Sequence, residues 1–211
     1  MAFSKIGIPY SGAILAWMDT RETLVAAALK VLEQHGEAQF STRAVCAIAN
    51  VTAPTLYHHF GNADGLVSAA IAEAFAQFLE SKKAATHSPD PETALRQGWD
   101  DYVRFAAARP QLYAAMMGRV LQGARIPAAE QAHALLMERI EAVAAEGRLS
   151  MTAEAAADLA WASANAAALL FVTARLQVTA RLQEPDPAVT DSLRDRAMQT
   201  ICKPRPKEKR A

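Results

Sequence analysis

Cysteine is scarce in this sequence, and so are aromatic residues. The two cysteines, Cys46 and Cys202, lie far apart, and neither has a histidine or another cysteine at the spacing of metal ligands. This scarcity excludes a disulfide framework and a zinc site of the usual pattern, and it favours a reducing compartment. Aromatic residues make up 7% of the chain, whereas apolar residues as a whole make up 52%. The sequence therefore predicts a folded protein with many alanines, whose helices pack closely together.

An excess of charge of one sign is also missing. Lys and Arg total 22, as do Asp and Glu, so the zero net charge gives no evidence for nucleic acid or a membrane as partner. No apolar run reaches the roughly 20 residues that a membrane-spanning helix needs. The most apolar stretch, residues 159–174, contains Asn165 and lies between Asp158 and Arg175. We therefore predict a cytoplasmic protein with no membrane partner.

The N-terminal stretch MAFSKIGIPYSGAILAW does not match a signal peptide. It carries one lysine and a Gly-Ile-Pro interruption, and it lacks a cleavage site of the small-x-small type. We interpret residues 1–18 as a loosely ordered arm, or as an over-long translation start for which Met18 is an alternative initiator.

Catalytic patterns are absent as well. The sequence has no Ser/His/Asp set, no paired carboxylates in an apolar setting, no His/Cys cluster and no glycine-rich phosphate loop. We therefore expect neither an enzyme nor a protein that needs a cofactor or a metal ion.

The sequence does contain a regular series of helix signals. Capping residues and prolines divide it into about nine segments with a helical spacing of apolar residues, and no strand pattern of useful length occurs. The fold class is therefore predicted to be all-α. The predicted helix starts are Asp19 or Thr20, Ser41, Thr52, Asn62, Asp90, Pro110, Pro127, Thr152, and Pro185 or Pro187.

Residues 41–60 predict a helix-turn-helix. The turn is centred on Asn50, the residue after glycine best suited to a positive φ, because its short side chain bonds locally. Val51 and Leu56 are spaced to pack inward, and Cys46 lies where two helices approach closely, so we interpret it as a packing residue. The outer side of the second helix is then formed by Ala53, Pro54, Thr55, Tyr57 and His58.

Such an outer face is typical of a recognition helix, whose N-terminal end enters the major groove of DNA. Thr42 and Thr52 lie at helix N-termini, where hydroxyl and amide groups hold phosphates. Arg43 is the best direct reader in the segment, since an arginine fork fits guanine O6 and N7. A surface ion pair is the alternative role for Arg43, and a surface helix hairpin is the alternative for the whole segment. We expect His58 to face the groove and His59 to pack.

Three stretches resemble the N-terminal domain of the TetR family of transcriptional regulators: TRETLVAAALKVLEQHG, FSTRAVCAIANVTAPTLYHHF and GNADGLVSAAIAEAF. The resemblance runs from Asp19 to about Glu80 and is looser beyond. It implies a DNA-binding regulator, most often a repressor, which binds a double-stranded operator as a homodimer and responds to a small effector. By matching positions, it implies base-edge contacts by Ala53, Pro54, Thr55 and His58, phosphate contacts by Thr42, Thr52 and Tyr57, and a base or backbone contact by Arg43.

The sequence departs from the family at two positions. Ala63 stands where the family commonly has a phosphate-binding lysine, and Asn50 stands where the turn commonly has glycine. Residues 19–65 contain three basic side chains against five acidic ones, a charge of −2. Because phosphate neutralisation normally dominates DNA affinity, we expect a weak binder, or one that relies on Lys5 or on the C-terminal tail KPRPKEKRA.

The predicted domains are an N-terminal arm (1–18), a three-helix helix-turn-helix domain (19–65), a larger ligand-binding and dimerisation domain (66–202) and a basic disordered tail (203–211). A ligand pocket would be lined by large apolar residues with a few polar groups. The candidates, for which plain core is the alternative role, are Trp99, Tyr102, Phe105, Tyr113, Met116, Met117, Met137, Trp161 and Asn165. Asn165 is the most informative, because a buried amide must find a partner in the ligand, another helix or the other subunit.

The dimer interface is predicted on residues 154–182 and 187–201. The first of these helices has a small and apolar surface suited to close packing, formed by Ala162, Ala166, Leu169, Leu170, Thr173 and Leu176. Two alternatives to a ligand-responsive regulator stay open. One keeps DNA binding and replaces the effector with a partner protein, and the other is a helical ligand- or protein-binding module with weak or lost DNA binding.

Overall fold

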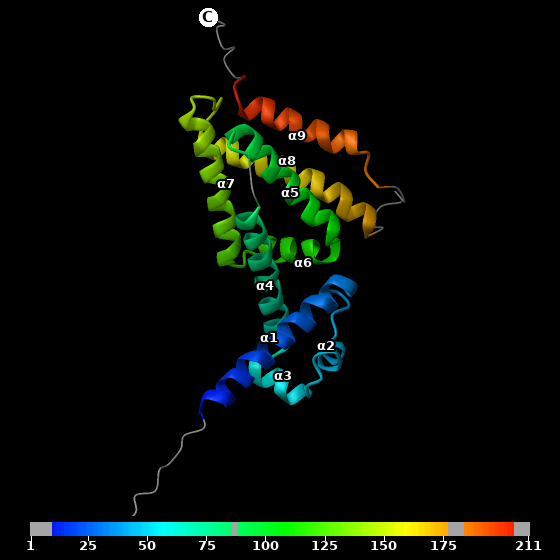
Figure 1. The fold of residues 1–211 in the computed structure, drawn as a ribbon. Helices are drawn as coiled ribbons and strands as arrows, with labels where there is room; N and C mark the ends of the chain where they lie inside the picture. Colours follow the sequence, from blue (N-terminus) through cyan, green and yellow to red (C-terminus); the bar gives the residue numbers. More distant parts are fainter. Residues whose placement is uncertain (1–9, 86–87, 177–183, 205–211) are drawn as a thin grey trace, which may run out of the picture. The chain divides into compact units, whose positions relative to one another are not determined.

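The computed structural model describes residues 10–85, 88–176 and 184–204, with side chains from Thr20 onward. These residues form helices and no named strand, and a single isolated bridge pairs Leu149 with Cys202. The predicted all-α class is confirmed. The helices, labelled in Figure 1, are α1 (Tyr10–His35), α2 (Thr42–Ala49), α3 (Ala53–Phe60), α4 (Ala63–Ala84), α5 (Pro91–Ala108), α6 (Pro110–Leu121), α7 (Pro127–Ala145), α8 (Ala153–Arg175) and α9 (Pro187–Ile201).

The chain divides into two compact units, one ending at Glu73 and the other beginning at Ala74. This division falls inside α4, beyond the predicted limit at Gly65, so one continuous helix contributes to both units. The predicted tail 203–211 lies outside the described residues except for residues 203 and 204.

Helix α1 begins earlier than predicted. Its first residue is Tyr10, so the predicted start at Asp19 or Thr20 was wrong, and residues 10–18 of the predicted arm are helical. Residues 10–18 contain no proline, and the second half of the stretch includes Leu15, Ala16 and Met18, which are good helix formers. The cap signal at Asp19 therefore lies inside a longer helix.

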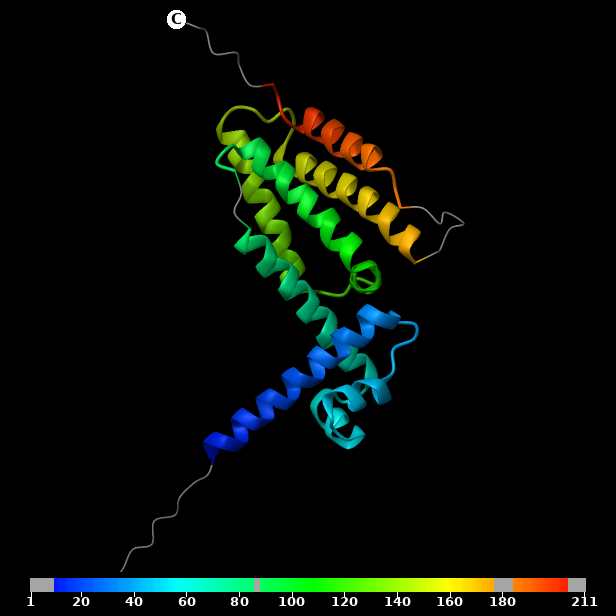
Figure 2. The same ribbon diagram turned by 45° about the vertical axis from the view of Figure 1, so that its right-hand side comes forward.

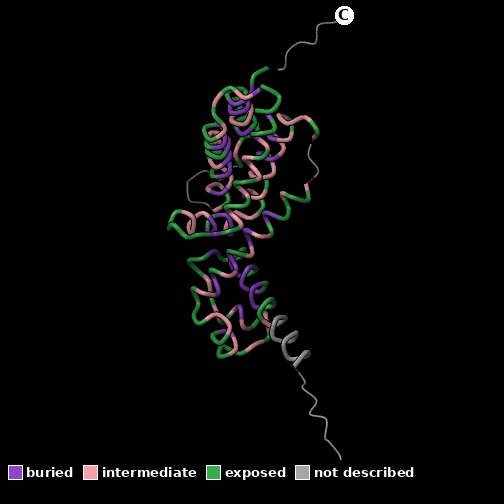
Figure 3. Tube along the Cα trace, turned by 90° about the vertical axis from the view of Figure 1, so that its left-hand side faces the viewer, coloured by how far each residue is buried: buried purple, intermediate pink, exposed green. Residues whose placement is uncertain are grey.

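The N-terminal unit is built around a small apolar core. Leu24, Leu32, Val45, Leu56 and Leu66 are fully buried and come from α1, α2, α3 and α4. Figure 3 shows buried and exposed positions alternating along these helices. Each short helix thus has one inward face and leaves its other side chains in solvent.

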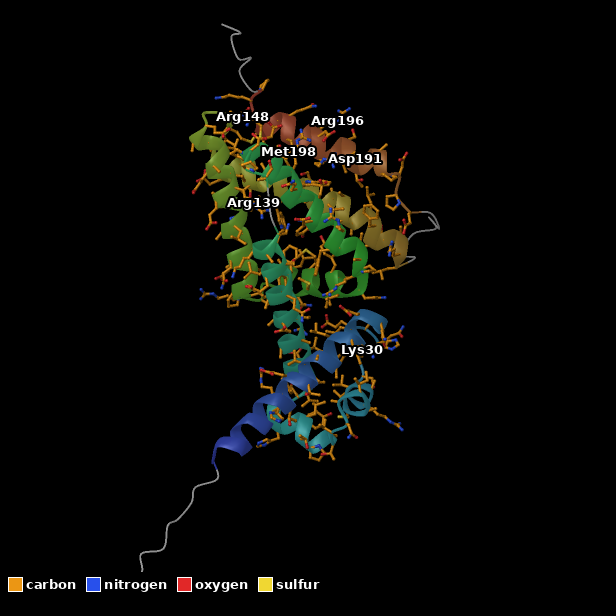
Figure 4. All side chains as sticks on the ribbon, in the orientation of Figure 1. Lys30, Arg139, Arg148, Asp191, Arg196 and Met198 are labelled. Carbon is orange, nitrogen blue, oxygen red and sulfur yellow. The ribbon has the colours of Figure 1, made fainter. Side chains whose placement is uncertain are left out.

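In the C-terminal unit, α8 packs against both α5 and α9 (Figure 2), and α7 packs on α5 and α8. The packed face of α8 is formed by small buried residues, from Ala156 to Ala168, which let neighbouring helices approach closely. By length and composition alone α8 could span a membrane. Its buried alanines from Ala156 to Ala167 instead belong to the core that contains Trp99, Ile140 and Met198, and a core helix passes the same test. Figure 4 labels Met198 on α9.

One buried arginine joins the ends of several helices. Arg148, which follows α7, is 6% exposed and bonds to Asp90 and Glu146 at 3.0 and 3.1 Å and to Glu92. Its backbone carbonyl also accepts from the amide of Lys203. This cluster fixes the start of α5 to the end of α7 and to the residues after α9.

Candidate DNA-binding helices and ligand cavity

The turn between α2 and α3 has the predicted geometry. Asn50 adopts φ 54° and ψ 44°, the left-handed region, and ends α2. Ser41 begins that helix, and its hydroxyl accepts from the amide of Ala44. Thr52 precedes α3, and Pro54 lies in the first turn, where a missing amide costs nothing. Residues 41–60 therefore form two short helices joined by a tight turn.

The side chains of α3 divide as the spacing predicts. Leu56 is fully buried together with Val45 of α2, whereas Val51 is half-buried. Of the residues predicted on the outer side of α3, Thr55 is half-buried and Tyr57 is 43% exposed. The exposed members of the predicted DNA-contact set on α3 and its cap are Thr52, Ala53, Pro54, Tyr57 and His58.

Two hydroxyl groups meet at the start of α3. The Oγ1 atoms of Thr52 and Thr55 lie 2.9 Å apart and share a hydrogen bond, and Thr52 forms no side-chain cap bond. Each hydroxyl has one proton, so the pair keeps one proton that can be donated to a phosphate. On α2, Thr42 is half-buried and Arg43 is exposed. Among the described side chains, none forms an ion pair with Arg43.

The two adjacent histidines differ in environment. His58 is exposed, whereas His59 is half-buried with its ring 6.1 Å from that of Phe60. Phe60 in turn lies under the guanidinium of Arg21 from α1, at 5.3 Å. Loss of water contact, followed by the charges of His58 and Arg21, lowers the pKa of His59. His59 thus packs at the end of α3, while His58 remains at the surface.

A cavity of about 330 Å³ lies within the C-terminal unit. It is lined by side chains from the second half of α4 and from α5, α6, α7 and α8. Four of the candidate ligand residues are in its wall: Trp99, Tyr102, Met117 and Trp161. A mostly apolar wall with a few polar groups is typical of a small-molecule site.

The other candidates lie beside the cavity rather than in its wall. Met116 is 3% exposed in the core, and Met137 packs on the core cluster. The ring of Phe105 contacts that of Phe78 in a tilted arrangement, with 4.8 Å between the ring centres. Asn165 accepts from the hydroxyls of Tyr102 and Tyr113, at 2.8 and 2.7 Å. Its side-chain amide also donates to the carbonyl of Trp161 at 2.8 Å. Within this chain, the partners of Asn165 are therefore two tyrosines of α5 and α6 and a carbonyl of its own helix.

The Tyr102 hydroxyl stands on the border between this cluster and the cavity. Burial, and then the neighbouring Tyr113, raise the pKa of Tyr102. The hydroxyl therefore stays protonated and acts as a donor to Asn165. This bond fixes the orientation of an aromatic ring in the cavity wall.

Charged residues in the cavity wall were missed by the sequence reasoning. Lys82 and Arg139 both line it, together with Asp158 and His133. Lys82 follows Phe75 and Phe78 at seven and four residues, and thus lies on the same helix face. That spacing is a signal that could have placed Lys82 in the wall. Arg139 carries no such local signal.

Comparison with known proteins adds to this geometry. Residues 24–70 match the family described as bacterial regulatory proteins, tetR family. No curated protein sequence matches the chain significantly. A solved protein of unknown function from Rhodococcus sp. RHA1 has a TM-score of 0.72 at 21% identity, over 87% of this chain and 96% of that one.

Solved TetR-family transcriptional regulators have the same fold. The one from Pectobacterium atrosepticum has a TM-score of 0.66 at 22% identity, over 90% of this chain and 98% of that one. The one from Haemophilus influenzae RD has a TM-score of 0.59 at 20% identity, over 89% and 99%. The resemblance seen in the sequence is thereby confirmed: residues 24–70 match the TetR-family N-terminal domain, and the chain as a whole has the fold of solved TetR-family transcriptional regulators.

Proposed function

We propose that this chain is a cytoplasmic, ligand-responsive DNA-binding regulator, and specifically a repressor. It binds a double-stranded operator as a homodimer through α2 and α3, and a small effector in the cavity of the C-terminal unit releases it. The observation that carries the proposal is the outer face of α3. There Tyr57 and His58 are exposed while Leu56 is fully buried, so a rigid short helix presents the predicted contacts to solvent.

The homodimer follows from the way a helix-turn-helix protein reads DNA. Two recognition helices are needed for two half-sites. Helix α8 supports this arrangement because its outer face exposes large apolar side chains: Trp161 is 48% exposed and Leu169 is 55% exposed, with the exposed Ala162 and Ala166 between them. Residues 177–182 of the predicted interface lie outside the described residues. On α9, Val189 is 48% exposed, whereas Asp191 and Arg196 make the outer face partly polar (Figure 4).

Helix α4 is the element through which a ligand can act. Its start is capped by Asn62, directly after α3, and its second half carries Phe75, Phe78 and Lys82 into the cavity wall. A ligand that prefers one tilt of α4 would change the distance between the two recognition helices of a dimer. The ligand shifts DNA binding only by its differential affinity for the two states.

Fluorescence anisotropy with labelled DNA from the promoter region beside the chain's own gene tests DNA binding. We expect sequence-dependent binding whose affinity decreases with salt, because phosphate contacts release counterions. A scrambled duplex of the same length is the control. Equal affinity for both duplexes, or no binding at low salt, would contradict the proposal.

The dimer is tested by Leu169→Glu, with Leu121→Glu as the matched control. Both leucines are exposed, at 55% and 86%, so neither change removes core packing. Sedimentation should give a monomer for Leu169→Glu and a dimer for the wild type and Leu121→Glu. If Leu169→Glu were still a dimer, the predicted location of the interface on this face of α8 would be contradicted.

A helical ligand- or protein-binding module with weak or lost DNA binding is the second candidate. The charge of −2 over residues 19–65 favours it, as does Ala63 at the first position of α4. The two candidates differ in one measurement. The module would bind a ligand or a partner protein with no sequence-dependent DNA affinity at any salt concentration.

A further inference from the structure

Two cationic side chains meet at one residue in the cavity wall. The ammonium of Lys82, on α4, donates to the backbone carbonyl of Gly98 on α5. The guanidinium of Arg139, on α7, occupies the space beside the same glycine, because a Cβ at Gly98 would lie 2.0 Å from its Nη1 atom. Figure 4 labels Arg139 on α7. Three helices thus bring two positive charges together at the cavity, and the missing side chain of Gly98 makes room for one of them.

The surroundings of these cations are mainly aromatic and aliphatic. The Lys82 ammonium lies 5.2 Å from the ring centre of Phe78 and 5.9 Å from that of Tyr102. Among the described residues, the rest of the wall contains no further lysine or arginine, and its histidine, His133, is exposed. Its main apolar members are Phe75, Leu95, Trp99, Met117, Leu136 and Ala164.

The other charges near the pair do not reverse its sign. Asp101 favours the charged forms of both Lys82 and Arg139, and the exposed Glu138 also favours that of Arg139, whereas Arg104 acts against the charge of Lys82. Asp101 is also bound to Arg104 at 2.7 Å, which divides its negative charge between several cations. The acidic wall residue, Asp158, is exposed, so water screens it.

Holding these cations beside the cavity has an energetic cost. Burial, and then the nearby Arg139, lower the pKa of Lys82 to about 8. Burial also lowers the pKa of Arg139. An anion placed between the two groups would restore favourable interactions in a setting of low dielectric, where a charge pair is stronger than in water.

We infer that the ligand of this cavity is an amphipathic carboxylate, whose charged end lies between Lys82 and Arg139 and whose hydrocarbon body lies against the aromatic wall. The inference deepens the proposed function, since it names the chemical class of the effector at the same site. A guanidinium fork matches the two oxygens of a carboxylate. The ammonium of Lys82 has three donors, of which the bond to Gly98 uses one.

Three probes with the same hydrocarbon chain test the class of ligand: decanoate, decanol and decylamine. Trp99 and Trp161 line the cavity, so tryptophan fluorescence reports binding on the full chain, and calorimetry gives the affinity. We expect decanoate to bind about tenfold or more tightly than decanol, because hydrogen bonds to charged groups are the strong ones. Decylamine should bind more weakly than either. Equal affinity for decanoate and decanol would overturn the inference.

Lys82→Met removes one cation and keeps most of the apolar side chain. It should lower decanoate affinity by about tenfold and leave decanol affinity unchanged. Lys83→Met is the matched control, since Lys83 is the next residue on α4, its side chain is 45% exposed, and it pairs with Glu80. A loss of decanoate affinity that is equal in the two variants would contradict a specific role for Lys82.

Gly98→Ala tests Arg139 without touching a charged residue. The added methyl group would displace the guanidinium, so decanoate affinity should fall severalfold while the helix remains folded, because alanine is the better helix former. Unchanged decanoate affinity in this variant would contradict the assigned place of Arg139.

The failure of this inference can be told from the failure of the proposed function. If decanol and decanoate release the operator equally, the proposed regulator function is supported and the assignment of a carboxylate ligand is contradicted. If decanoate binds with the expected selectivity and the chain has no operator affinity, the carboxylate site is supported and the proposed regulator function is contradicted.

Discussion

The two regions expected to meet anions differ in where their positive charge lies. The helix-turn-helix segment, residues 19–65, carries a charge of −2, and the cation on its proposed DNA-facing side, Arg43, is exposed to water. The cavity of the C-terminal unit instead holds Lys82 and Arg139 around one glycine, both partly buried. A surface cation is screened by water and salt, whereas a buried one is not. The cavity thus has two partly buried cations at one glycine, whereas the surface proposed for DNA has an exposed one.

Because of this difference, the proposed affinity for a small ligand and the proposed affinity for DNA would have different physical sources. The proposed ligand site would discriminate between head groups of a small ligand, since its cations are partly buried. The surface proposed for DNA would instead rely on the fit of α3, on the dipoles of helix N-termini and, in the proposed dimer, on two linked half-sites. Both kinds of recognition can then coexist in a chain of zero net charge.

The largest predicted effect concerns a buried cation with a structural role. Arg148→Met removes the partner of Asp90, Glu92 and Glu146, and we expect it to lower the free energy of unfolding by about 2–3 kcal/mol. The full cost of breaking a buried pair is reduced here because the side chains of the three carboxylates are 24%, 24% and 44% exposed. Urea denaturation measures this difference.

Arg125→Met is the control for that measurement. Arg125 and its partner Glu130 are 85% and 55% exposed, so removing the pair should change stability by less than about 0.5 kcal/mol. If the Arg148 and Arg125 variants were equally stable, the contrast between buried and surface cations would not hold within the C-terminal unit.

The local features of the fold were predictable because their causes are local. Ser41, Asp90 and Thr152 each accept from an amide three residues later, a bond set by sequence spacing alone. Asn50 likewise adopts the positive φ that its side chain tolerates. The start of α1 at Tyr10 was not predictable in this way, because the helix extends on the N-terminal side of the cap signal at Asp19.

The cavity was only partly predictable, for a different physical reason. Large apolar residues such as Trp99 and Met117 were predicted to line a pocket, and they do face the cavity. Lys82 and Arg139 lie on helices far apart in sequence, and only tertiary packing brings them to Gly98. Asn165 was expected to be informative, and it forms a cluster with two tyrosines beside the cavity.

The second predicted effect concerns the exposed cation of the DNA-binding unit. Arg43→Ala should weaken operator binding by about 1–3 kcal/mol and relax specificity at one base pair if the side chain contacts a guanine. Tyr57→Phe, which removes only a hydroxyl, should weaken binding to all sequences by a smaller amount. Anisotropy against single-base variants of the operator distinguishes the two patterns. A uniform loss in Arg43→Ala would assign Arg43 to the phosphate backbone.

A third effect follows from the ionisation of Lys82. Its pKa of about 8 means that the ammonium is mostly charged at pH 7 and mostly neutral at pH 9. Binding of a carboxylate favours the charged form, so decanoate affinity should be nearly full at pH 7, begin to fall as the pH approaches 8, and be severalfold lower, at most about tenfold, by pH 9. Arg139 remains charged over this range, which limits the loss.

Calorimetry at pH 7 and pH 9 checks this dependence. Decanol has no charge, so its affinity in the wild type is the control and should be the same at both pH values. Lys82→Met should bind decanoate with no change between pH 7 and pH 9. A decrease of the same size in that variant would assign the titration to another group.

The smallest predicted effect adds a cation to the DNA-binding unit. Ala63 is exposed at the first position of α4, and Ala63→Lys should steepen the dependence of operator affinity on salt by about one unit. A lysine at a helix N-terminus opposes the helix dipole, so the same variant should lose about 0.3–1 kcal/mol of stability. Ala134→Lys, at an exposed position of α7, adds the same charge in the other unit and should leave the salt dependence unchanged. An equal change in both variants would mean that net charge rather than position controls DNA affinity, and the contrast between the two regions would lose its basis.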